Sequence, residues 1–399
     1  MRRRAFVKHL GLLSSTSMLF AENWSTAANL IKDNYTELEK HKISNMELID
    51  LNYHWPRFVG KNGRIDFHGQ YHTCTALRLR TDQGAAGWGL SNKSAENLYP
   101  LLKGHKVSDL IQPQIGIPNT LDRSVDFALH DLMGVILNKP VYQLLGNEGT
   151  KETKVYSGMI YLDELNPGNE TKGFDVVLEN CDWDYKYGYR QLKVKIGRSG
   201  RWYPHDEGLN KDIEIVKLIR EAFKDQSTEI LVDSNDMYSL NDTIKFLDGI
   251  GDIPLFWVEE PFTENLEDGR TLRKWMDNNG FGNTYYADGE AQPNHEVCLE
   301  LGKEKMMDVF LPDIYGLGFT EWIRLQKKLK EIGMLGSPHA WGNRLKTNYI
   351  THIAAAFGNI PTIEGVTCFS DEIDFGNYPI IDGKLRVSDA PGFGMKILK

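Results

Sequence analysis

Short apolar runs alternate with amphipathic stretches between residues 150 and 370. The runs are rich in β-branched and aromatic residues, as in Glu229-Ile-Leu-Val-Asp233 and Leu255-Phe-Trp-Val-Glu259, which is typical of strands. Between the runs, apolar residues recur at helical spacing, as in 212–223 and 322–332. Strands that alternate with helices predict a parallel sheet. The predicted strands are 153–158, 191–197, 229–233, 255–259, 285–290, 309–313, 334–339 and 361–364.

Seven residues with chemically active side chains stand at or near the ends of these runs. They are Lys195, Asp233, Glu259, Glu290, Asp313, His339 and Glu364, at intervals of 38, 26, 31, 23, 26 and 25 residues. A TIM barrel places eight βα units in about 250 residues, or roughly 30 per unit, and its catalytic side chains lie at the C-terminal strand ends. The pattern therefore predicts an α/β fold with a modified (β/α)8 (TIM-type) barrel, of (β/α)7β type, over residues 150–370.

Residues 45–148 precede this barrel and have a different pattern. The predicted elements are strands 45–53 and 73–81, a turn and short strand over 82–89, and a helix over 123–137. Pro140 follows the helical periodicity and stops it. We expect an N-terminal α+β capping domain over residues 45–148. The final segment, residues 371–399, lies beyond the eighth predicted strand and is expected to pack on the cap.

The first thirty residues differ from the rest of the chain. The segment Arg3-Arg4-Ala5-Phe6-Val7-Lys8 is similar to a twin-arginine export signal, and the apolar segment 10–20 is too short to span a bilayer. The small residues 25–28 offer a candidate cleavage site. We therefore interpret residues 1–30 as an export signal and expect a periplasmic protein. A basic N-terminus on a cytoplasmic protein is the alternative.

Composition and charge restrict the class of function. The chain of 399 residues carries a net charge of −9, and no basic stripe interleaved with aromatic residues occurs in it. A nucleic-acid footprint is therefore not expected, and a small-molecule substrate is. The four cysteines are far apart and form no CxxC pair, so the sequence predicts neither a zinc site nor a disulfide framework. They are Cys74, Cys181, Cys298 and Cys368, expected as buried thiols.

Three of the seven residues suit a metal ion. Asp233, Glu259 and Glu290 follow three successive predicted strands, and three carboxylates supply the hard oxygen ligands that Mg²⁺ prefers, with water and substrate completing the octahedron. One Mg²⁺ per subunit is predicted. Asp288, two residues before Glu290, is the alternative third ligand.

Lys193 and Lys195 alternate on one predicted strand, so both side chains point to the barrel interior. Two buried ammonium groups repel each other, and a nearby divalent ion adds to this effect. Both influences lower a lysine pKa. One of the two amines is therefore expected to act as a base near neutral pH.

His339 and Asp313 end the seventh and sixth predicted strands, so the carboxylate can orient the imidazole and raise its basicity. Glu364, on the last strand, can share a hydrogen bond with a developing enolate oxygen if its surroundings keep it protonated. An ion pair with a barrel lysine is the alternative role of Glu364. These parts fit the removal of a proton next to a carboxylate.

Six short motifs together resemble those of the enolase superfamily, in its mandelate racemase subgroup. The motifs are Lys193-Val-Lys195-Ile-Gly197, Asp233-Ser-Asn235, Trp257-Val-Glu-Glu-Pro261, Gly289-Glu290, Leu311-Pro-Asp313 and Ser337-Pro-His339. Ala128-Leu-His-Asp131, followed by Lys139-Pro-Val-Tyr-Gln-Leu-Leu-Gly146, is similar to the segment that joins cap and barrel in that family. The resemblance covers roughly residues 45–390.

The resemblance implies a role for each matching residue. The metal ligands would be Asp233, Glu259 and Glu290, with Glu260 beside them. Lys195 would be the base on one face of the substrate, and His339 with Asp313 would act on the other face. Lys193 would neutralise the substrate carboxylate, and Glu364 would form a hydrogen bond with the enolate. Asp313 stands where the cycloisomerase subgroup has a lysine, and Glu290 stands where glucarate dehydratases typically have an asparagine. Both of those subgroups fit less well.

The resemblance also implies a reaction, a Mg²⁺-dependent abstraction of the α-proton through a stabilised ene-diolate. Dehydration of a sugar acid, an aldonate or aldarate, to a 2-keto-3-deoxy acid is the favoured outcome. A cycloisomerase of an anhydro-sugar acid and a racemase or epimerase are the alternatives within this chemistry. A sugar-acid-binding protein without turnover is the alternative of another class. The family is commonly oligomeric, which predicts a homo-oligomer.

Substrate recognition is expected in the cap and after the seventh strand. The candidates are Arg57, Lys61, Arg64 and His68 in the segment 57–71, together with Asn235, Trp341 and Asn343. The cap residues are expected to contact a polyhydroxylated or second acidic end of the substrate. The segment 198–208, which contains Trp202 and His205, is long for a βα loop and is expected to shape the pocket mouth or an oligomer contact.

Overall fold

The structure is a computed structural model that describes residues 35–399 except 170 and 291. The export-signal interpretation falls on residues 1–30 and so lies outside the described residues. Within the described residues, no helix is long and apolar enough to cross a membrane.

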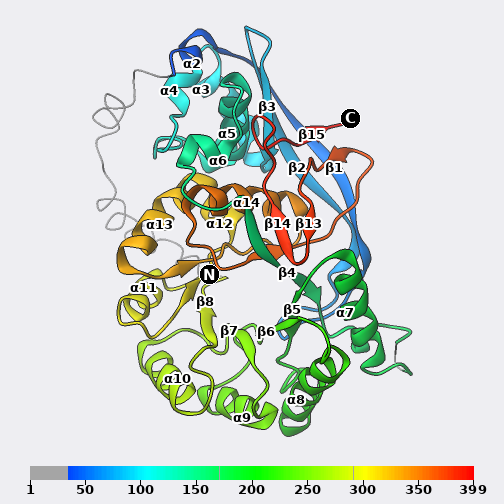
Figure 1. Ribbon diagram of the computed structural model, residues 1–399. Helices are drawn as coiled ribbons and strands as arrows, with labels where there is room; N and C mark the ends of the chain where they lie inside the picture. Colours follow the sequence, from blue (N-terminus) through cyan, green and yellow to red (C-terminus); the bar gives the residue numbers. More distant parts are fainter. Residues whose placement is uncertain (1–34, 170, 291) are drawn as a thin grey trace, which may run out of the picture.

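Eight parallel strands curl into a barrel, as predicted (Figure 1). They are β4 (Glu152–Ile160), β5 (Gln191–Lys195), β6 (Glu229–Asp233), β7 (Leu255–Glu259), β8 (Tyr285–Asp288), β9 (Val309–Phe310), β10 (Leu335–Gly336) and β11 (Ile363–Gly365). Hydrogen-bonded neighbours run from β4 to β10 in chain order, and β11 pairs with β4. Ser337 Oγ, which follows β10, donates to the Thr362 carbonyl beside β11 at 2.8 Å and so links the two ends of the sheet.

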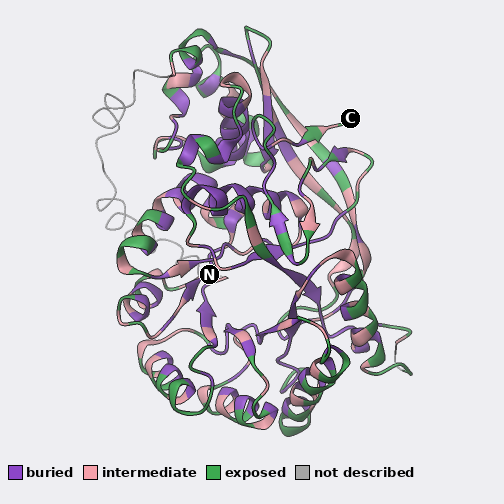
Figure 2. Cartoon of the chain, viewed as in Figure 1, coloured by how far each residue is buried: buried purple, intermediate pink, exposed green. Residues whose placement is uncertain are grey.

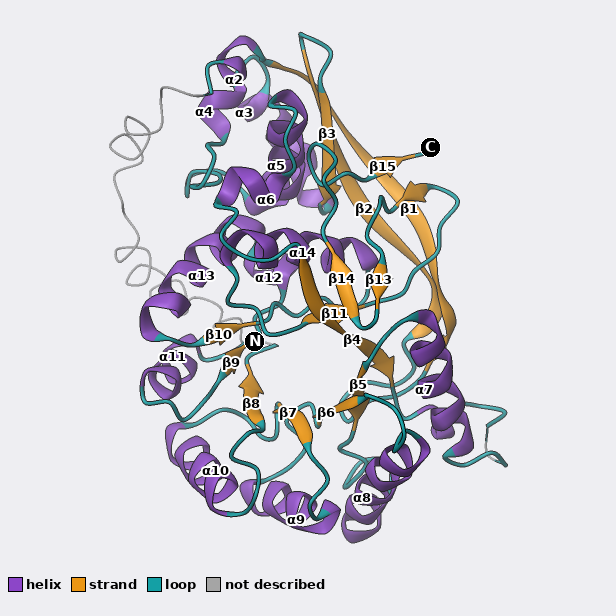
Figure 3. Cartoon of the chain, in the orientation of Figure 1, coloured by secondary structure: helices purple, strands orange, loops and turns teal. Residues whose placement is uncertain are grey.

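Helices surround this barrel (Figure 3). They are α7 (Asp175–Tyr187), α8 (His205–Ala222), α9 (Leu240–Ile250), α10 (Leu266–Asn278), α11 (His295–Lys303), α12 (Ile314–Leu317), α13 (Phe319–Ile332) and α14 (Arg344–Phe357), with the short turn η3 (Asp163–Leu165) after β4. Each amphipathic helix buries one face; in α9 the buried residues include Phe246, Leu247 and Ile250. Ser239 and Asp242 form a capping box that satisfies free N–H groups at the start of α9.

The cap is a three-stranded antiparallel sheet covered by short helices (Figure 1). Its elements are β1 (Ile43–Val59), β2 (Gly69–Thr81), β3 (Ala86–Leu90), α2 (Glu37–Lys40), η1 (Lys93–Leu98), α3 (Tyr99–Leu102), α4 (Val107–Leu110), η2 (Arg123–Val125), α5 (Asp126–Ile136) and α6 (Val141–Leu145). β1 continues past its predicted end at Tyr53, and its regular pairing with β2 stops between His54 and Val59. Pro56 lies in that stretch, where a missing N–H costs no ladder hydrogen bond.

The C-terminal segment contacts both the cap and the barrel. β12 (Ile373–Asp374) pairs with β15 (Lys396–Ile397), and the hairpin of β13 (Ile380–Ile381) and β14 (Lys384–Arg386) adds to β4. In the cap, the carboxylate of Asp131 on α5 accepts hydrogen bonds from the backbone N–H groups of Phe393 at 2.7 Å and Trp88 at 2.9 Å. This carboxylate therefore connects the C-terminal segment to the cap. Residues 371–399 were expected to pack on the cap. They do contact the cap, and they also pair with strand β4 of the barrel.

Buried positions follow the inner strands and the facing sides of the helices (Figure 2). All four cysteines are free thiols; Cys181, Cys298 and Cys368 are buried as expected, whereas Cys74 is only half-buried.

Arg198 holds the C-terminal end of β5 in place through buried hydrogen bonds. Its guanidinium is fully buried, with Nε 2.8 Å from Glu164 Oε1 and Nη1 2.7 Å from Asp212 Oδ1. Nη1 also donates to the carbonyl of Lys195 at 3.2 Å. Asp212 Oδ2 accepts from the Tyr238 hydroxyl at 2.7 Å. The segment 198–208 thus begins with a buried residue that supports the end of β5.

Replacing Arg198 with methionine is expected to lower the free energy of unfolding by about 3–5 kcal/mol, because Glu164 and Asp212 then remain buried without their cation. Urea denaturation followed by circular dichroism measures this difference. The matched control is Arg201→Met in the same segment, whose exposed pair with Asp66 should contribute under about 1 kcal/mol. Equal losses in the two variants would contradict the anchoring role of Arg198.

Candidate active site

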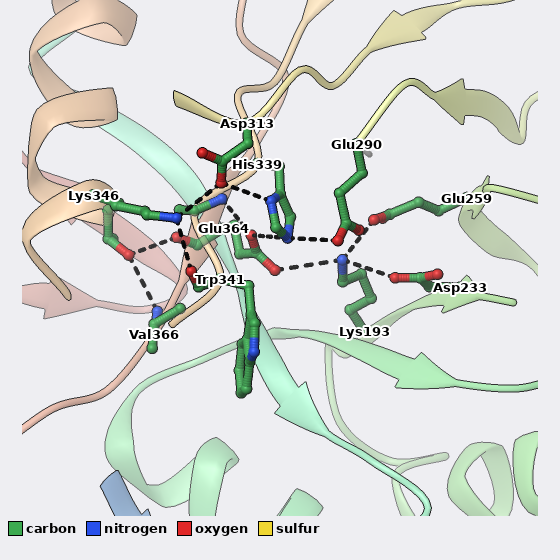
Figure 4. Close-up of polar contacts among 12 residues, drawn as sticks. Lys193, Asp233, Glu259, Glu290, Asp313, His339, Trp341, Lys346, Glu364 and Val366 are labelled. Carbon is green, nitrogen blue, oxygen red and sulfur yellow. Dashed lines mark hydrogen bonds and ion pairs between the residues drawn. The ribbon is translucent and has the colours of Figure 1, made fainter. Parts of the chain in front are cut away.

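Strand register brings the predicted carboxylates together at the barrel mouth. Lys195 at the end of β5 lies opposite Asp233 at the end of β6, and Asp233 lies opposite Glu259 at the end of β7. Glu290 follows β8 and reaches the same place (Figure 4). One oxygen each from Asp233, Glu259 and Glu290 lies within 4.8 Å of the others. Parallel strands end at the same edge of a sheet, so this grouping follows from the fold.

The donors of this carboxylate group fit a divalent cation. Glu259 Oε2 and Glu290 Oε2 are buried and have no hydrogen-bond partner among the described residues. Burial and the neighbouring charge of Asp233 raise the pKa of Glu259 well above its usual value. A bound cation would relieve both costs, and three carboxylate oxygens in this geometry suit Mg²⁺.

Asp288 does not join this group. It lies with Asp236 and Glu260 in a second set of carboxylates. Its Oδ2 accepts from the Tyr286 hydroxyl at 3.0 Å and its Oδ1 from the Gly289 N–H at 2.7 Å. Of the two alternatives for the third ligand, the geometry favours Glu290.

Both barrel lysines point into the carboxylate group. Lys193 Nζ lies 2.6 Å from Glu259 Oε1 and 3.1 Å from Asp233 Oδ2, and Lys195 pairs with Asp233. The side chains of Lys193 and Lys195 are only 1% and 3% exposed. Both ammonium groups are therefore sequestered from bulk water beside the proposed ligands.

The protein groups by themselves raise the pKa values of both barrel lysines, whereas the expected lowering also invoked a divalent ion. Burial works to lower the pKa of Lys195, but the charge of Asp233 outweighs it and the repulsion from Lys193, and the net pKa is raised. For Lys193, burial is likewise outweighed by Glu259 and Glu364, and the pKa is raised. The attraction between each ammonium group and its neighbouring carboxylates exceeds the repulsion between the two lysines. Both amines therefore hold their protons in this arrangement.

His339 links the carboxylate group to a second acid. Its Nδ1 donates to Asp313 Oδ2 at 3.0 Å, and its Nε2 lies 3.1 Å from Glu290 Oε1. Burial works to lower the pKa of His339, but Glu290, Glu364 and Asp313 outweigh it and raise the pKa. Burial also works to raise the pKa of Asp313, but the hydrogen bond from His339 and the charge of Lys346 hold it well below its usual range. The pair is arranged as the sequence predicted.

Glu364 is an ionised acid in this setting. Its carboxylate accepts from the Ala340 N–H at 2.6 Å and lies 3.4 Å from Lys193 Nζ and 3.6 Å from His339 Nε2. Burial works to raise its pKa, but Lys193 and His339 outweigh burial and lower it. The expectation that Glu364 stays protonated is not met, because two cationic groups face it. The alternative, an ion pair with a barrel lysine, is what the structure shows.

The three Lys and Arg residues of segment 57–71 are held in other contacts. The guanidinium of Arg57 forms a two-point pair with Asp184, with both distances at 2.8 Å. Arg64 pairs with Asp236. The ammonium of Lys61 lies over the rings of Phe67 and Trp202, at 4.8 and 4.0 Å from their centroids. Arg57 is therefore structural, although the sequence suggested a substrate contact.

An aromatic wall formed by His68, Tyr161 and Trp341 faces the carboxylate group. The ring centroids of His68 and Tyr161 are 4.7 Å apart, and those of Tyr161 and Trp341 are also 4.7 Å apart. Lys195 Nζ lies 5.5 Å from the centroid of the Tyr161 ring. This placement keeps His68 and Trp341 as candidates for substrate contacts.

Two other predicted residues have local roles. Asn343 Oδ1 accepts from the Leu345 N–H at 2.9 Å and caps α14. Asn235 Nδ2 donates to Glu260 Oε2 at 3.3 Å, and Asn235 Oδ1 is buried and has no hydrogen-bond partner in the described part of the chain. Asn235 therefore still has an acceptor to offer a ligand, whereas the side-chain oxygen of Asn343 is occupied.

Sequence reasoning missed Tyr161 and Lys346. Tyr161 directly follows β4, which was predicted to end at Gly158; a strand assignment through Ile160 would have found it. Lys346 lies on α14, with Nζ 2.8 Å from Asp313 Oδ2 and 3.1 Å from the Trp341 carbonyl. A lysine near the start of an amphipathic helix carries no local signal for such a contact.

Comparisons with known proteins identify the family that the chain matches. Residues 177–399 match the family model described as enolase C-terminal domain-like. An arabinonate dehydratase from Saccharolobus solfataricus is 27% identical over 242 residues, covering 60% of this chain and 59% of that protein. An N-succinyl-L-Arg/Lys racemase from Bacillus cereus is 23% identical over 241 residues, covering 54% of this chain and 60% of that protein. The chain thus spans about 60% of the length of these curated relatives.

A solved structure matches nearly the whole fold. A galacturonate dehydratase from Geobacillus sp., complexed with D-galacturonate and 5-keto-4-deoxy-D-galacturonate, is 29% identical with a TM-score of 0.84, covering 90% of this chain and 95% of that chain. A mutant of the same dehydratase, crystallised in complex with Mg, has the same identity and TM-score.

Glu290→Gln is expected to weaken Mg²⁺ binding at least about tenfold, because it removes one anionic ligand. Isothermal titration calorimetry on EDTA-treated protein measures the affinity. Thermal unfolding checks it, since a ligand at about 100 times its Kd stabilises the fold by about 2.7 kcal/mol. Glu296→Gln on the exposed side of α11 is the matched control and should bind Mg²⁺ normally. Unchanged affinity in Glu290→Gln would argue against Glu290 as a ligand.

In metal-free protein, the His339 ring is expected to titrate above pH 6.5, because the surrounding carboxylates raise its pKa. The imidazolium contributes stability fully below pH 6.5, and this contribution is lost as the pH rises through the folded-state pKa. Asp313→Asn removes one of these carboxylates and should lower the titration midpoint. NMR chemical shifts of the imidazole ring against pH provide the measurement, and a midpoint at or below 6.5 in the wild type would contradict the expectation.

Proposed function

The chain belongs to the enolase superfamily, and from this premise we propose that it is a sugar-acid dehydratase that removes the proton next to the substrate carboxylate. The observation that carries the proposal is the placement of two proton-carrying groups around one set of carboxylates. Lys195 contacts Asp233 on one side of the set, and His339 contacts Glu290 on the other. A substrate bound at this set would lie between a lysine and a histidine.

Asp233, Glu259 and Glu290 are the residues that would hold Mg²⁺. The ion would supply positive charge beside the substrate carboxylate, where negative charge grows as the α-proton leaves. Lys193 adds a second positive charge at this place, because its ammonium is buried and already contacts Glu259 and Asp233. Fixed charges in a site shielded from water stabilise such a transition state without reorganising solvent.

Lys195 is the proposed base for the α-proton. Its ammonium is held by the charge of Asp233, so any neutralisation of Asp233 lowers the pKa of Lys195 and releases the amine for catalysis. The α C–H bond breaks with its proton going to the amine. The C–O bond at the β-carbon breaks next, and His339 gives its proton to the departing hydroxyl, which leaves as water. The enol that remains tautomerises to a 2-keto-3-deoxy acid.

Three further side chains position the acid. Asp313 accepts from His339 Nδ1, which fixes the tautomer that presents Nε2 to the substrate. Lys346 holds Asp313 in turn. Glu364 contacts both Lys193 and His339, and we assign it to orienting these two groups instead of donating a proton.

The same pair of groups also supports the isomerase alternatives. If no β-hydroxyl leaves, a proton taken by Lys195 and returned by His339 inverts the α-carbon, as in a racemase or epimerase. In an anhydro-sugar acid the β-oxygen belongs to a ring, so breaking the same C–O bond opens the ring. The oxygen takes a proton from His339 and stays in the product as a hydroxyl group, no water leaves, and the reaction is the isomerisation of the cycloisomerase alternative. We also propose that the protein assembles into a homo-oligomer and is exported through the twin-arginine route.

Purified protein with Mg²⁺ is expected to convert at least one sugar acid to a keto-deoxy acid, detected as its semicarbazone and by NMR in deuterium oxide. Lys195→Ala and His339→Ala should each lower kcat at least about 100-fold, since each removes one proton-transfer group. The control Lys217→Ala changes an exposed lysine of α8 and should be active. Inversion with deuterium incorporation and no keto product would instead identify an epimerase, and neither signal would favour a binding protein without turnover.

A further inference from the structure

The cap loop, defined as residues 60–68 between β1 and β2, is fastened to the barrel mouth. The Leu162 N–H after β4 donates to the Lys61 carbonyl at 2.9 Å, and Asp163 Oδ1 accepts from the Gly60 N–H at 2.8 Å. Trp202 Nε1 donates to the Asn62 carbonyl at 2.8 Å. These contacts come from segments that follow β4 and β5, so the loop lies over the C-terminal ends of the strands. Its side chains are therefore placed to meet the part of a substrate far from the metal-binding carboxylates.

The cations of this region are already committed to other groups. Arg64 is neutralised by Asp236, and Arg57, at the end of β1, is neutralised by Asp184. Lys61 lies between two aromatic rings. On the opposite side of the mouth, Lys346 pairs with Asp313. A second substrate carboxylate at the far end would therefore meet cations whose charge is already neutralised, or held against aromatic rings.

His68 offers a hydrogen-bond acceptor at this end. Its Nδ1 lies 2.6 Å from the Gly60 carbonyl oxygen, which can only accept, so Nδ1 carries the hydrogen. The neutral ring then presents Nε2 as a lone pair. Burial lowers the pKa of His68, which favours the neutral ring near pH 7, and the charges of Lys195 and Glu290 are close enough to influence it. An acceptor lone pair binds a hydroxyl hydrogen and repels a carboxylate.

The surroundings of His68 strengthen this selectivity. Its ring packs against Tyr161 and Trp341, with centroids 4.7 and 5.7 Å away. Trp341 is backed by Trp55, whose ring centroid lies 4.9 Å from it. Aromatic rings accept the C–H faces of a sugar, whereas a carboxylate removed from water beside them without a cation is strongly disfavoured.

We propose that the site accepts sugar acids with a single carboxylate, aldonates or uronates, and that His68 determines this preference by accepting a hydrogen bond from a hydroxyl group at the far end of the substrate. The proposal rests on the proposed dehydratase function, because the first carboxylate is assigned to the metal-binding end of the site. It excludes aldarates, which carry a carboxylate at both ends.

The test compares matched sets of aldonate, uronate and aldarate in the galactose, glucose and mannose configurations, with the Mg²⁺-loaded protein. Both turnover and binding by isothermal titration calorimetry are measured. Within the preferred configuration, a monoacid is expected to exceed the aldarate about 100-fold in kcat/KM and in affinity. An aldarate that equals or exceeds both monoacids overturns the proposal. If monoacids bind selectively but yield no keto-deoxy product, the dehydratase function fails and the recognition stands; if no sugar acid binds, both fail.

Variants of His68 test the residue itself. His68→Leu is expected to raise KM for the preferred monoacid about tenfold, as one neutral hydrogen bond contributes, with kcat within about threefold of the wild type. His68→Gln retains an acceptor and should restore most of the affinity. His54→Leu, on the same hairpin with its ring against Tyr71 and Phe369, is the matched control and should leave KM unchanged.

His68→Arg supplies a cation at this end and should raise kcat/KM for the aldarate at least about tenfold. Thermal unfolding verifies that each variant is folded. An unchanged KM in a folded His68→Leu variant, or no gain for the aldarate in a folded His68→Arg variant, would overturn the role of His68.

Discussion

The crowding of carboxylates at one end of a parallel barrel is the constraint on which the site depends. Asp233, Glu259 and Glu364 are buried there with Glu290 beside them, and the ammonium groups of Lys193 and Lys195 face the set. Like charges removed from water repel strongly, so this arrangement requires further positive charge. The same imbalance raises the pKa values of both lysines and favours the binding of a divalent ion.

The rest of the molecule holds this unfavourable arrangement in place. Arg198 fixes the end of β5 through a buried pair with Asp212, and the capped and amphipathic helices hold the strands in register. Asp131 connects the cap to the C-terminal segment, whose hairpin adds to β4. A site made of repelling groups is stable only where packing elsewhere supplies the free energy.

Much of the barrel could be predicted because its signals are local. The predicted strands that end at Asp233 and Glu259 have the same bounds as β6 and β7. The order of the strand ends brings the seven predicted residues to one end of the barrel. Strand ends were less accurate where loops take over; β8 stops at Asp288, although Glu290 still reaches the site. Side-chain electrostatics were predicted poorly. The raised lysine pKa values and the ionised state of Glu364 depend on distances between strands, which no local pattern contains.

The sequence by itself determined the alternation of strands and helices, the cap, and the types of side chain at the strand ends, because hydrophobic periodicity and spacing are properties of the chain. Only the tertiary structure decided which of these side chains meet. Arg57, Lys61 and Arg64 resemble substrate contacts in the sequence, yet folding commits each to another group. His68 is also a candidate substrate contact in the sequence, but only the structure shows that the Gly60 carbonyl fixes its tautomer and makes Nε2 an acceptor. Pairing in space, which sets charge and hydrogen-bond direction, is therefore the information that the linear pattern lacks.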